Sequence, residues 1–155
     1  MHNRREMLIR SAQVAGMLAA LGMLPEFAHA QAAGYNTAAF DAKTMADLMK
    51  ALGGAAPVES KDVTITGPDI AENGAVVPVG AATSLPGVKR MLLLVEKNPA
   101  MLSAMFDVSD AVEANFSTRV KMGQSSNVTA VAVLADGKVI FAHKEIKVTL
   151  GGCGG

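Results

Sequence analysis

Residues 127–150 read NVTAVAVLADGKVIFAHKEIKVTL, and this stretch decides the fold. Two β-prone runs are separated by Asp136-Gly137, a dipeptide typical of the tight turn of a β-hairpin. In the second run, apolar residues alternate with polar ones, as in a strand with one buried face: Ile146, Val148 and Leu150. The stretch therefore predicts an antiparallel hairpin of strands over Asn127–Leu134 and Lys138–Leu150.

Five further β-prone runs precede this hairpin. They span Lys61–Thr66, Ala75–Ala82, Val88–Glu96, Leu102–Val108 and Phe116–Met122. Gly, Pro, Asn and Asp, the residues that turns require, lie between them: Gly67-Pro68-Asp69, Asn73-Gly74, Leu85-Pro86-Gly87 and Asn98-Pro99. About seven short strands at this spacing predict an all-β fold, an immunoglobulin-like antiparallel β-sandwich. With a single cysteine, the sandwich lacks the disulfide of antibody domains.

Two of these runs are apolar on both faces, Met91–Val95 and Val128–Leu134. A sandwich strand needs only one apolar face, so something must cover the other side. The cover is either a helix or loop of this chain, or a stable partner subunit, and both can hold together. Met91–Val95 is the first candidate for a surface that contacts a partner.

One helix is predicted ahead of the strands, because apolar residues recur at helical spacing from Phe40 to Leu52. Thr37 can cap its start, and Gly53-Gly54 ends it. The mature chain thus divides into a helical segment at residues 31–56, a β-sandwich at 57–150 and a terminal segment at 151–155.

The terminal segment places the only cysteine, Cys153, among glycines alone: Gly151, Gly152, Gly154 and Gly155. Glycine adds no side-chain bulk and gives the backbone its widest freedom, so a flexible arm is expected. At about 3.3 to 3.6 Å per extended residue, the arm can hold the sulfur roughly 10 Å beyond Leu150. Such a thin stalk fits a narrow channel in another protein.

The thiol of Cys153 has no activating group beside it in the sequence. No Lys, Arg or His lies within the tail, and the nearby terminal carboxylate opposes ionisation. This favours a substrate carrier, on which other proteins act, over an enzyme. Two alternatives stay open: a thiol redox or disulfide-exchange protein, and an exported structural module that dimerises through Cys153.

The amino terminus carries an export signal. Arg4-Arg5 is followed by an apolar stretch over Ser11–Leu24 and by Ala28-His29-Ala30, a small-x-small cleavage pattern. Residues 1–30 therefore read as a cleaved twin-arginine (Tat) signal, which carries a folded protein to the bacterial periplasm. The apolar stretch is shorter than the roughly 20 residues of a spanning helix, so no membrane anchor is expected after cleavage.

Charge and composition exclude nucleic-acid binding. Without the three arginines and two glutamates of residues 1–30, the 14 basic and 14 acidic residues become 11 and 12. No basic patch remains, Trp is absent and aromatic residues are few. One Cys and one His in the mature chain are too few for a metal site, so no cofactor is expected.

The sequence resembles the SoxY family, the sulfur carriers of the bacterial thiosulfate-oxidising (Sox) system. The resemblance spans the mature chain and is strongest at the extreme terminus, Val148–Gly155. Further stretches that carry it are Ala51–Gly54, Asp69–Val79, Leu94–Pro99 and Ser117–Gly123.

The resemblance implies a periplasmic heterodimer with SoxZ, another small immunoglobulin-like protein. It also implies that SoxAX joins thiosulfate oxidatively to Cys153 as a cysteine S-thiosulfonate. SoxB then removes the sulfonate as sulfate and leaves a persulfide, which SoxCD, where present, oxidises further. In this sequence Cys153 holds the position of the carrier cysteine.

Overall fold

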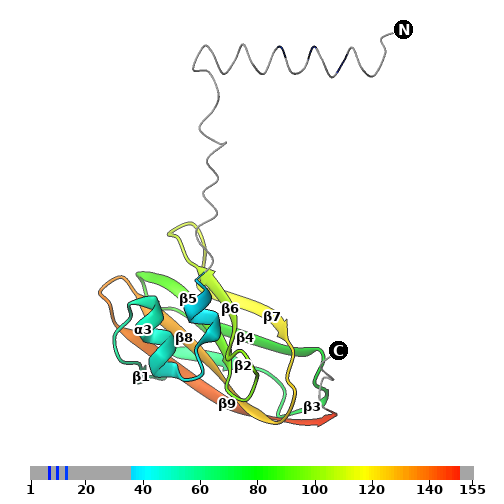
Figure 1. Cartoon of the computed structure of the whole chain (residues 1–155). Helices are drawn as coiled ribbons and strands as arrows, with labels where there is room; N and C mark the ends of the chain where they lie inside the picture. Colours follow the sequence, from blue (N-terminus) through cyan, green and yellow to red (C-terminus); the bar gives the residue numbers. More distant parts are fainter. Residues whose placement is uncertain (1–6, 8–9, 11–12, 14–35, 151–155) are drawn as a thin grey trace. The chain divides into compact units, whose positions relative to one another are not determined.

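The computed structural model describes Met7, Arg10, Gln13 and residues 36–150. The strands and their helices belong to one compact unit that begins at Asn36 (Figure 1). Within the described residues, no helix is both long enough and apolar enough to cross a bilayer.

The described residues contain nine β-strands where the sequence predicted about seven. They are β1 (Val58–Glu59), β2 (Val63–Thr66), β3 (Ile70–Asn73), β4 (Val77–Thr83), β5 (Val88–Val95), β6 (Leu102–Asp107), β7 (Asn115–Val120), β8 (Ser126–Leu134) and β9 (Val139–Leu150). All seven predicted strands are present, and β1 and β3 are the two additions.

The strands form two sheets, which confirms the immunoglobulin-like β-sandwich. The larger sheet has the order β1-β9-β8-β5-β6, with β3 also paired to β9, and the smaller sheet has the order β2-β4-β7. The prediction of an antiparallel sandwich holds for the seven predicted strands, whereas the two additional strands, β1 and β3, run parallel to β9. These two strands have two and four residues, too few for a pattern of alternating burial to reveal them.

The predicted hairpin joins β8 and β9. Their register runs from Ser126 opposite Ile146 to Val133 opposite Val139. At the turn, Gly137 has a φ of 88°, a left-handed conformation that favours glycine. The Asp136-Gly137 signal therefore identified both the turn and the strands that it connects.

The main core lies between the two sheets. Its buried members come from both sides, for example Val79 of β4, Leu93 of β5 and Ala130 of β8. Burial alternates along β7, since Val120 is buried and Arg119 exposed. Each sheet thus contributes one apolar face.

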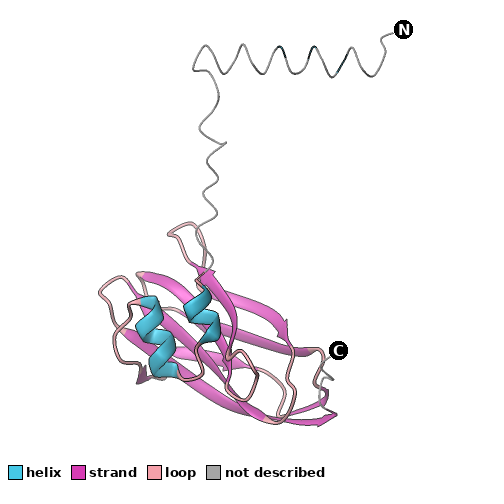
Figure 2. Cartoon of the chain, in the orientation of Figure 1, coloured by secondary structure: helices cyan, strands magenta, loops and turns pink. Residues whose placement is uncertain are grey.

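Two short helices cover the other face of the larger sheet (Figure 2). Helix α2 spans Thr37–Asp41 and helix α3 spans Met45–Leu52. Leu48 and Met49 of α3 pack with Leu92, Leu94 and Val131 in a second core cluster. The helices of this chain therefore cover the doubly apolar strands.

The prediction of one continuous helix capped by Thr37 was wrong. Asn36 caps α2 instead, through a hydrogen bond of 3.1 Å from the Ala39 amide to its side chain. Thr44 interrupts the predicted helix because its backbone is extended. Its hydroxyl accepts a hydrogen bond from the Asp47 amide at 3.1 Å, so Thr44 is the N-cap of α3. Gly53 ends α3 as predicted, with a φ of 68°.

Met91–Val95 was also the wrong candidate for a partner surface. All five of its residues have 0% exposure, so no partner can touch their side chains while the helices stay in place.

The contribution of the second core cluster to stability can be tested by mutation. Leu48→Ala should lower the free energy of unfolding by about 2 to 5 kcal/mol, because it leaves a cavity between α3 and the sheet. Urea denaturation would measure the change, with Lys50→Ala on the exposed side of the same helix as the control. Equal stability of the two variants would mean that α3 does not seal the sheet.

Candidate functional site at the end of strand β9

Several predicted site residues lie outside the described residues. These are Arg4, Arg5, Ala28 and Ala30 of the signal, Cys153, and Gly151, Gly152, Gly154 and Gly155 of the arm. The described chain ends at Leu150, the residue from which the arm starts. The local structure of residues 147–150 therefore defines how the arm is attached.

The last four residues of β9 extend beyond its antiparallel partner. The pairing with β8 ends at Ser126 opposite Ile146. From there β3 runs alongside β9 in parallel, with Ile70 opposite Lys147 and Asn73 opposite Leu150 (Figure 1). One edge of the strand is thus hydrogen-bonded along these last residues.

A serine bonds to the other edge of β9, beyond the last residue that pairs with β8. The amide of Val148 donates a hydrogen bond of 2.9 Å to the hydroxyl of Ser125. The Leu150 carbonyl accepts from the Gly74 amide at 2.8 Å, and the Thr149 hydroxyl donates to the Glu72 carbonyl at 3.1 Å. Residues 148, 149 and 150 each have a fixed partner, so the chain is held as far as Leu150.

An ion pair attaches the start of β3 to β9. The Lys144 ammonium lies 2.9 Å from the Asp69 carboxylate and donates to the Gly67 carbonyl at 2.6 Å. The hydrogen bond from Lys144, and then its positive charge, lower the pKa of Asp69 below its ordinary value. The backbone of Asp69 also takes part, since its carbonyl accepts from the Lys147 amide at 3.0 Å.

The smaller sheet is tied to the same place. The Met122 amide donates to the Gly74 carbonyl at 2.7 Å, while the Gly74 amide bonds to Leu150. Asn98 reaches the following turn from the β5–β6 loop, donating to the Lys121 carbonyl at 2.6 Å and accepting from the Gly123 amide at 3.3 Å. The arm therefore starts at a junction of both sheets.

Side-chain burial at this junction differs in part from the prediction. Ile146 is fully buried and Val148 half-buried, as expected for the core-facing side of β9. Leu150 was expected to be buried with them, yet it is 72% exposed. The sandwich ends before Leu150, so its backbone is paired while its side chain faces solvent.

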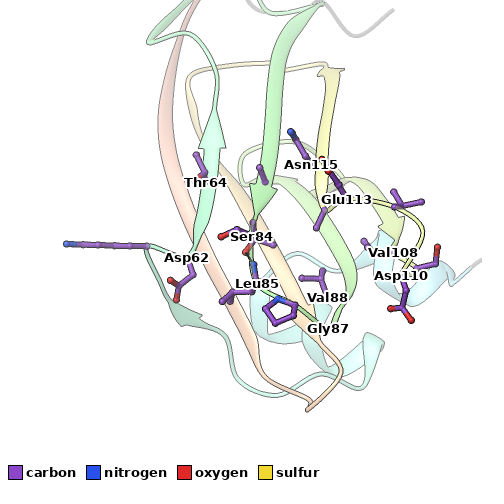
Figure 3. Close-up of a pocket in the computed structure, with 17 residues that line it drawn as sticks. Asp62, Thr64, Ser84, Leu85, Gly87, Val88, Val108, Asp110, Glu113 and Asn115 are labelled. Atoms are coloured by element: carbon purple, nitrogen blue, oxygen red, sulfur yellow. Dashed lines mark hydrogen bonds between the residues drawn. The ribbon is translucent and has the colours of Figure 1, made fainter.

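A separate hollow of about 850 Å³ lies at the opposite end of the sandwich (Figure 3). Its walls include Thr64 of β2, Val88 of β5 and Asn115 of β7, with Asp110 and Glu113 from the β6–β7 loop. Among the described residues, no group of three His, Cys, Asp or Glu side chains could hold a metal ion.

Sequence reasoning located the arm but missed its supports. Ser125 and Lys144 were not singled out, and Asp69 was read only as a turn residue, because each of the three acts on a segment distant in sequence. The one available signal was the short apolar pair Ile70-Ala71 between two turn motifs, which marks a brief strand.

These features define a class: a small β-sandwich whose last strand, fixed on both edges, leads directly into a glycine-rich segment with one cysteine. Residues 48–153 match the family described as sulfur oxidation protein SoxY, a match that includes Cys153. The chain belongs to the SoxY family. Membership establishes a sulfur-carrier role in the Sox system.

Solved structures agree with the family match. The sulfur carrier protein SoxY from Chlorobium limicola f thiosulfatophilum is 35% identical, with a TM-score of 0.60 over 66% of this chain and 93% of that one. A superoxide reductase (neelaredoxin) from Ignicoccus hospitalis is 18% identical, with a TM-score of 0.50 over 56% of this chain and 79% of that one. The second likeness shows a shared fold alone. No curated protein matches the sequence.

The ion pair at the arm junction predicts a pH effect. Because Lys144 lowers the pKa of Asp69, the pair stabilises the folded state above the ordinary aspartate pKa, and this contribution is lost as pH falls through the lowered value. Near neutral pH, Asp69→Asn should speed hydrogen exchange of the Lys147 amide by a factor of a few, the scale of exposed ion pairs. The difference from the wild type should vanish well below pH 4, about where free aspartate titrates.

The matched control is Asp136→Asn. Hydrogen bonds from Lys138 lower the pKa of Asp136 as well, but that pair lies at the β8–β9 turn. This variant should leave exchange at Lys147 unchanged. Equal exchange in the wild type and Asp69→Asn near neutral pH would show that the pair does not hold β3.

Proposed function

We propose that this chain carries sulfur intermediates of thiosulfate oxidation covalently on Cys153 and presents them to partner enzymes in the periplasm. The observation that carries the proposal is the SoxY family match through Cys153, three residues beyond a strand fixed on both edges. The proposal gives this chain no catalytic group and no resident cofactor.

The chemistry needs two steps at the sulfur of Cys153. In the first, the thiolate and thiosulfate form an S–S bond, and SoxAX accepts the two electrons released. The product, a cysteine S-thiosulfonate, ends in a sulfonate. In the second, SoxB adds water across the bond between the outer sulfur and the sulfonate, which releases sulfate and leaves a persulfide on Cys153. SoxCD, where present, oxidises that sulfur further.

A tethered intermediate suits this chemistry for a physical reason. Covalent attachment keeps reactive sulfur from diffusing away and supplies it to each enzyme at high effective concentration. The glycines beside Cys153 leave the thiol accessible, while the fixed end of β9 sets where the arm emerges. Activation of the thiol must come from the enzyme that receives it, because the arm sequence contains no base.

The proposal includes a heterodimer with SoxZ. A folded pair is a suitable cargo for Tat export, since one signal can carry both subunits. Docking of SoxAX, SoxB and SoxCD to the pair would be transient, because each must release the arm to the next.

Replacement of the carrier sulfur tests the central step. Wild-type protein from thiosulfate-grown cells should show mass additions of thiosulfonate or polysulfide type on Cys153 by peptide mass spectrometry. Cys153→Ser should show none and should abolish sulfate release by the reconstituted enzymes, with folding unchanged because the residue lies beyond β9. A bare thiol, or only a disulfide-linked dimer, would favour one of the two alternative functions.

Export can be tested separately. Arg4→Lys together with Arg5→Lys should retain the protein in the cytoplasm, because Tat export requires the arginine pair. Cell fractionation and the mass of the exported product, cut after Ala30, would measure this. The control is Arg10→Lys, outside the pair. Normal export of the double variant would contradict the Tat route.

A further inference from the structure

The arm is short, and its length sets a limit on every enzyme that uses it. Only Gly151 and Gly152 separate Leu150 from Cys153, which gives a reach of roughly 10 Å. If Cys153 carries the substrate, as proposed above, the mouth of any receiving channel must come within that distance of Leu150. The surface around Leu150 is then forced into contact with each enzyme.

Two exposed apolar side chains lie on that surface. Leu150 is 72% exposed and Val76 is 53% exposed. The turn that carries Val76 is bonded to the end of β9, because the Gly74 amide donates to the Leu150 carbonyl at 2.8 Å. Within the turn, the Ala75 amide donates to the Asn73 side chain at 2.9 Å, and the Val76 amide lies 3.4 Å from the Asn73 carbonyl. These hydrogen bonds hold the backbone of Leu150 against the turn that carries Val76.

Two cations border this apolar pair. In the β4–β7 ladder Val77 lies opposite Val120 and Pro78 opposite Arg119. The hydrogen bond from Met122 to Gly74 is shifted by one residue from this register, and it places Lys121, the residue before Met122, beside the turn that carries Val76. Opposite residues of an antiparallel pair share a face, so Arg119 lies on one face with Pro78, close to the same turn. Both cations are exposed, and within the described residues neither forms an ion pair.

We propose that Val76, Leu150, Arg119 and Lys121 form a docking rim that seats against the channel mouth of each partner enzyme. The matching mouth would have an apolar collar and carboxylates beside it. Apolar burial at the centre of such a contact supplies affinity, while opposite charges at its edge speed encounter and make it depend on salt. A second copy of this chain is a poor occupant, because its rim would bring like charges together.

The test uses the assembled carrier complex, charged with thiosulfate at Cys153, and the partner hydrolase that releases sulfate. The variants are Val76→Ser, Leu150→Ser and Lys121→Glu. Leu150→Ser should raise KM for the carrier by about 5- to 30-fold, the usual effect of losing a central contact, with kcat unchanged because the reacting sulfur is the same. Lys121→Glu should raise KM mainly at low salt.

The matched control is Val58→Ser. Val58 is 63% exposed, and it pairs with Ile140 near the start of β9, ten residues from Leu150. It should leave KM unchanged. Thermal melting verifies folding, and if Leu150→Ser melts early, Val76→Ser and Lys121→Glu still decide the question.

The outcomes separate the rim from the carrier function. Thiosulfonate mass on Cys153 in every variant, with equal KM values, would overturn the rim and leave the carrier intact. A wild-type chain that takes up no thiosulfonate would overturn the carrier function and the rim with it. A loss of subunit association in the rim variants, seen by sedimentation, would assign this surface to a partner subunit and also overturn the rim.

Discussion

The backbone pairing on both edges of β9 is the interaction on which the arrangement depends. Along most of its length the strand is bonded to β8, and β1 and β3 pair with its other edge at separate points. Where the pairing with β8 ends at Ser126, β3 pairs with one edge of residues 147–150 and the Ser125 hydroxyl accepts a hydrogen bond on the other edge. Without them, residues 147–150 would fray as an unsupported strand end. The attachment point of the arm would then move with them, whatever the stability of the sandwich.

The two-sided burial of β5 and β8 explains why helices belong to this fold. Leu93 and Ala130 face the smaller sheet, whereas Leu92, Leu94 and Val131 face the helices. Leaving the second side bare would expose a contiguous apolar patch, which soluble monomers rarely do. Helices α2 and α3 therefore act as a third layer. Because they cover this face, the side chains of β5 and β8 that point toward the helices are closed to any partner.

Much of this fold could be predicted from the sequence, and the limits have physical causes. Alternating burial and turn chemistry located seven strands and the Asp136-Gly137 turn, because both signals are local. β1 and β3 were missed because their pairing with β9 depends on residues far along the chain. The break at Thr44 was missed because a helical apolar pattern continues across it, and only its N-cap geometry reveals the break. At the site, composition predicted the arm, while its supports are backbone pairings and side-chain contacts between residues distant in sequence, which no motif encodes.

The change from fixed strand to glycine segment has an energetic consequence for the proposed carrier. Ordering five glycine-rich residues in a channel costs on the order of 5 to 10 kcal/mol, at about 1 to 2 kcal/mol for each residue. A mobile attachment would add to that cost, whereas here the chain up to Leu150 is already ordered before any enzyme binds. The remaining cost keeps each complex short-lived unless the surface beside the arm contributes. In the mechanism we propose, a small rim would orient the arm without holding it, and this balance would let one cysteine serve several enzymes in turn.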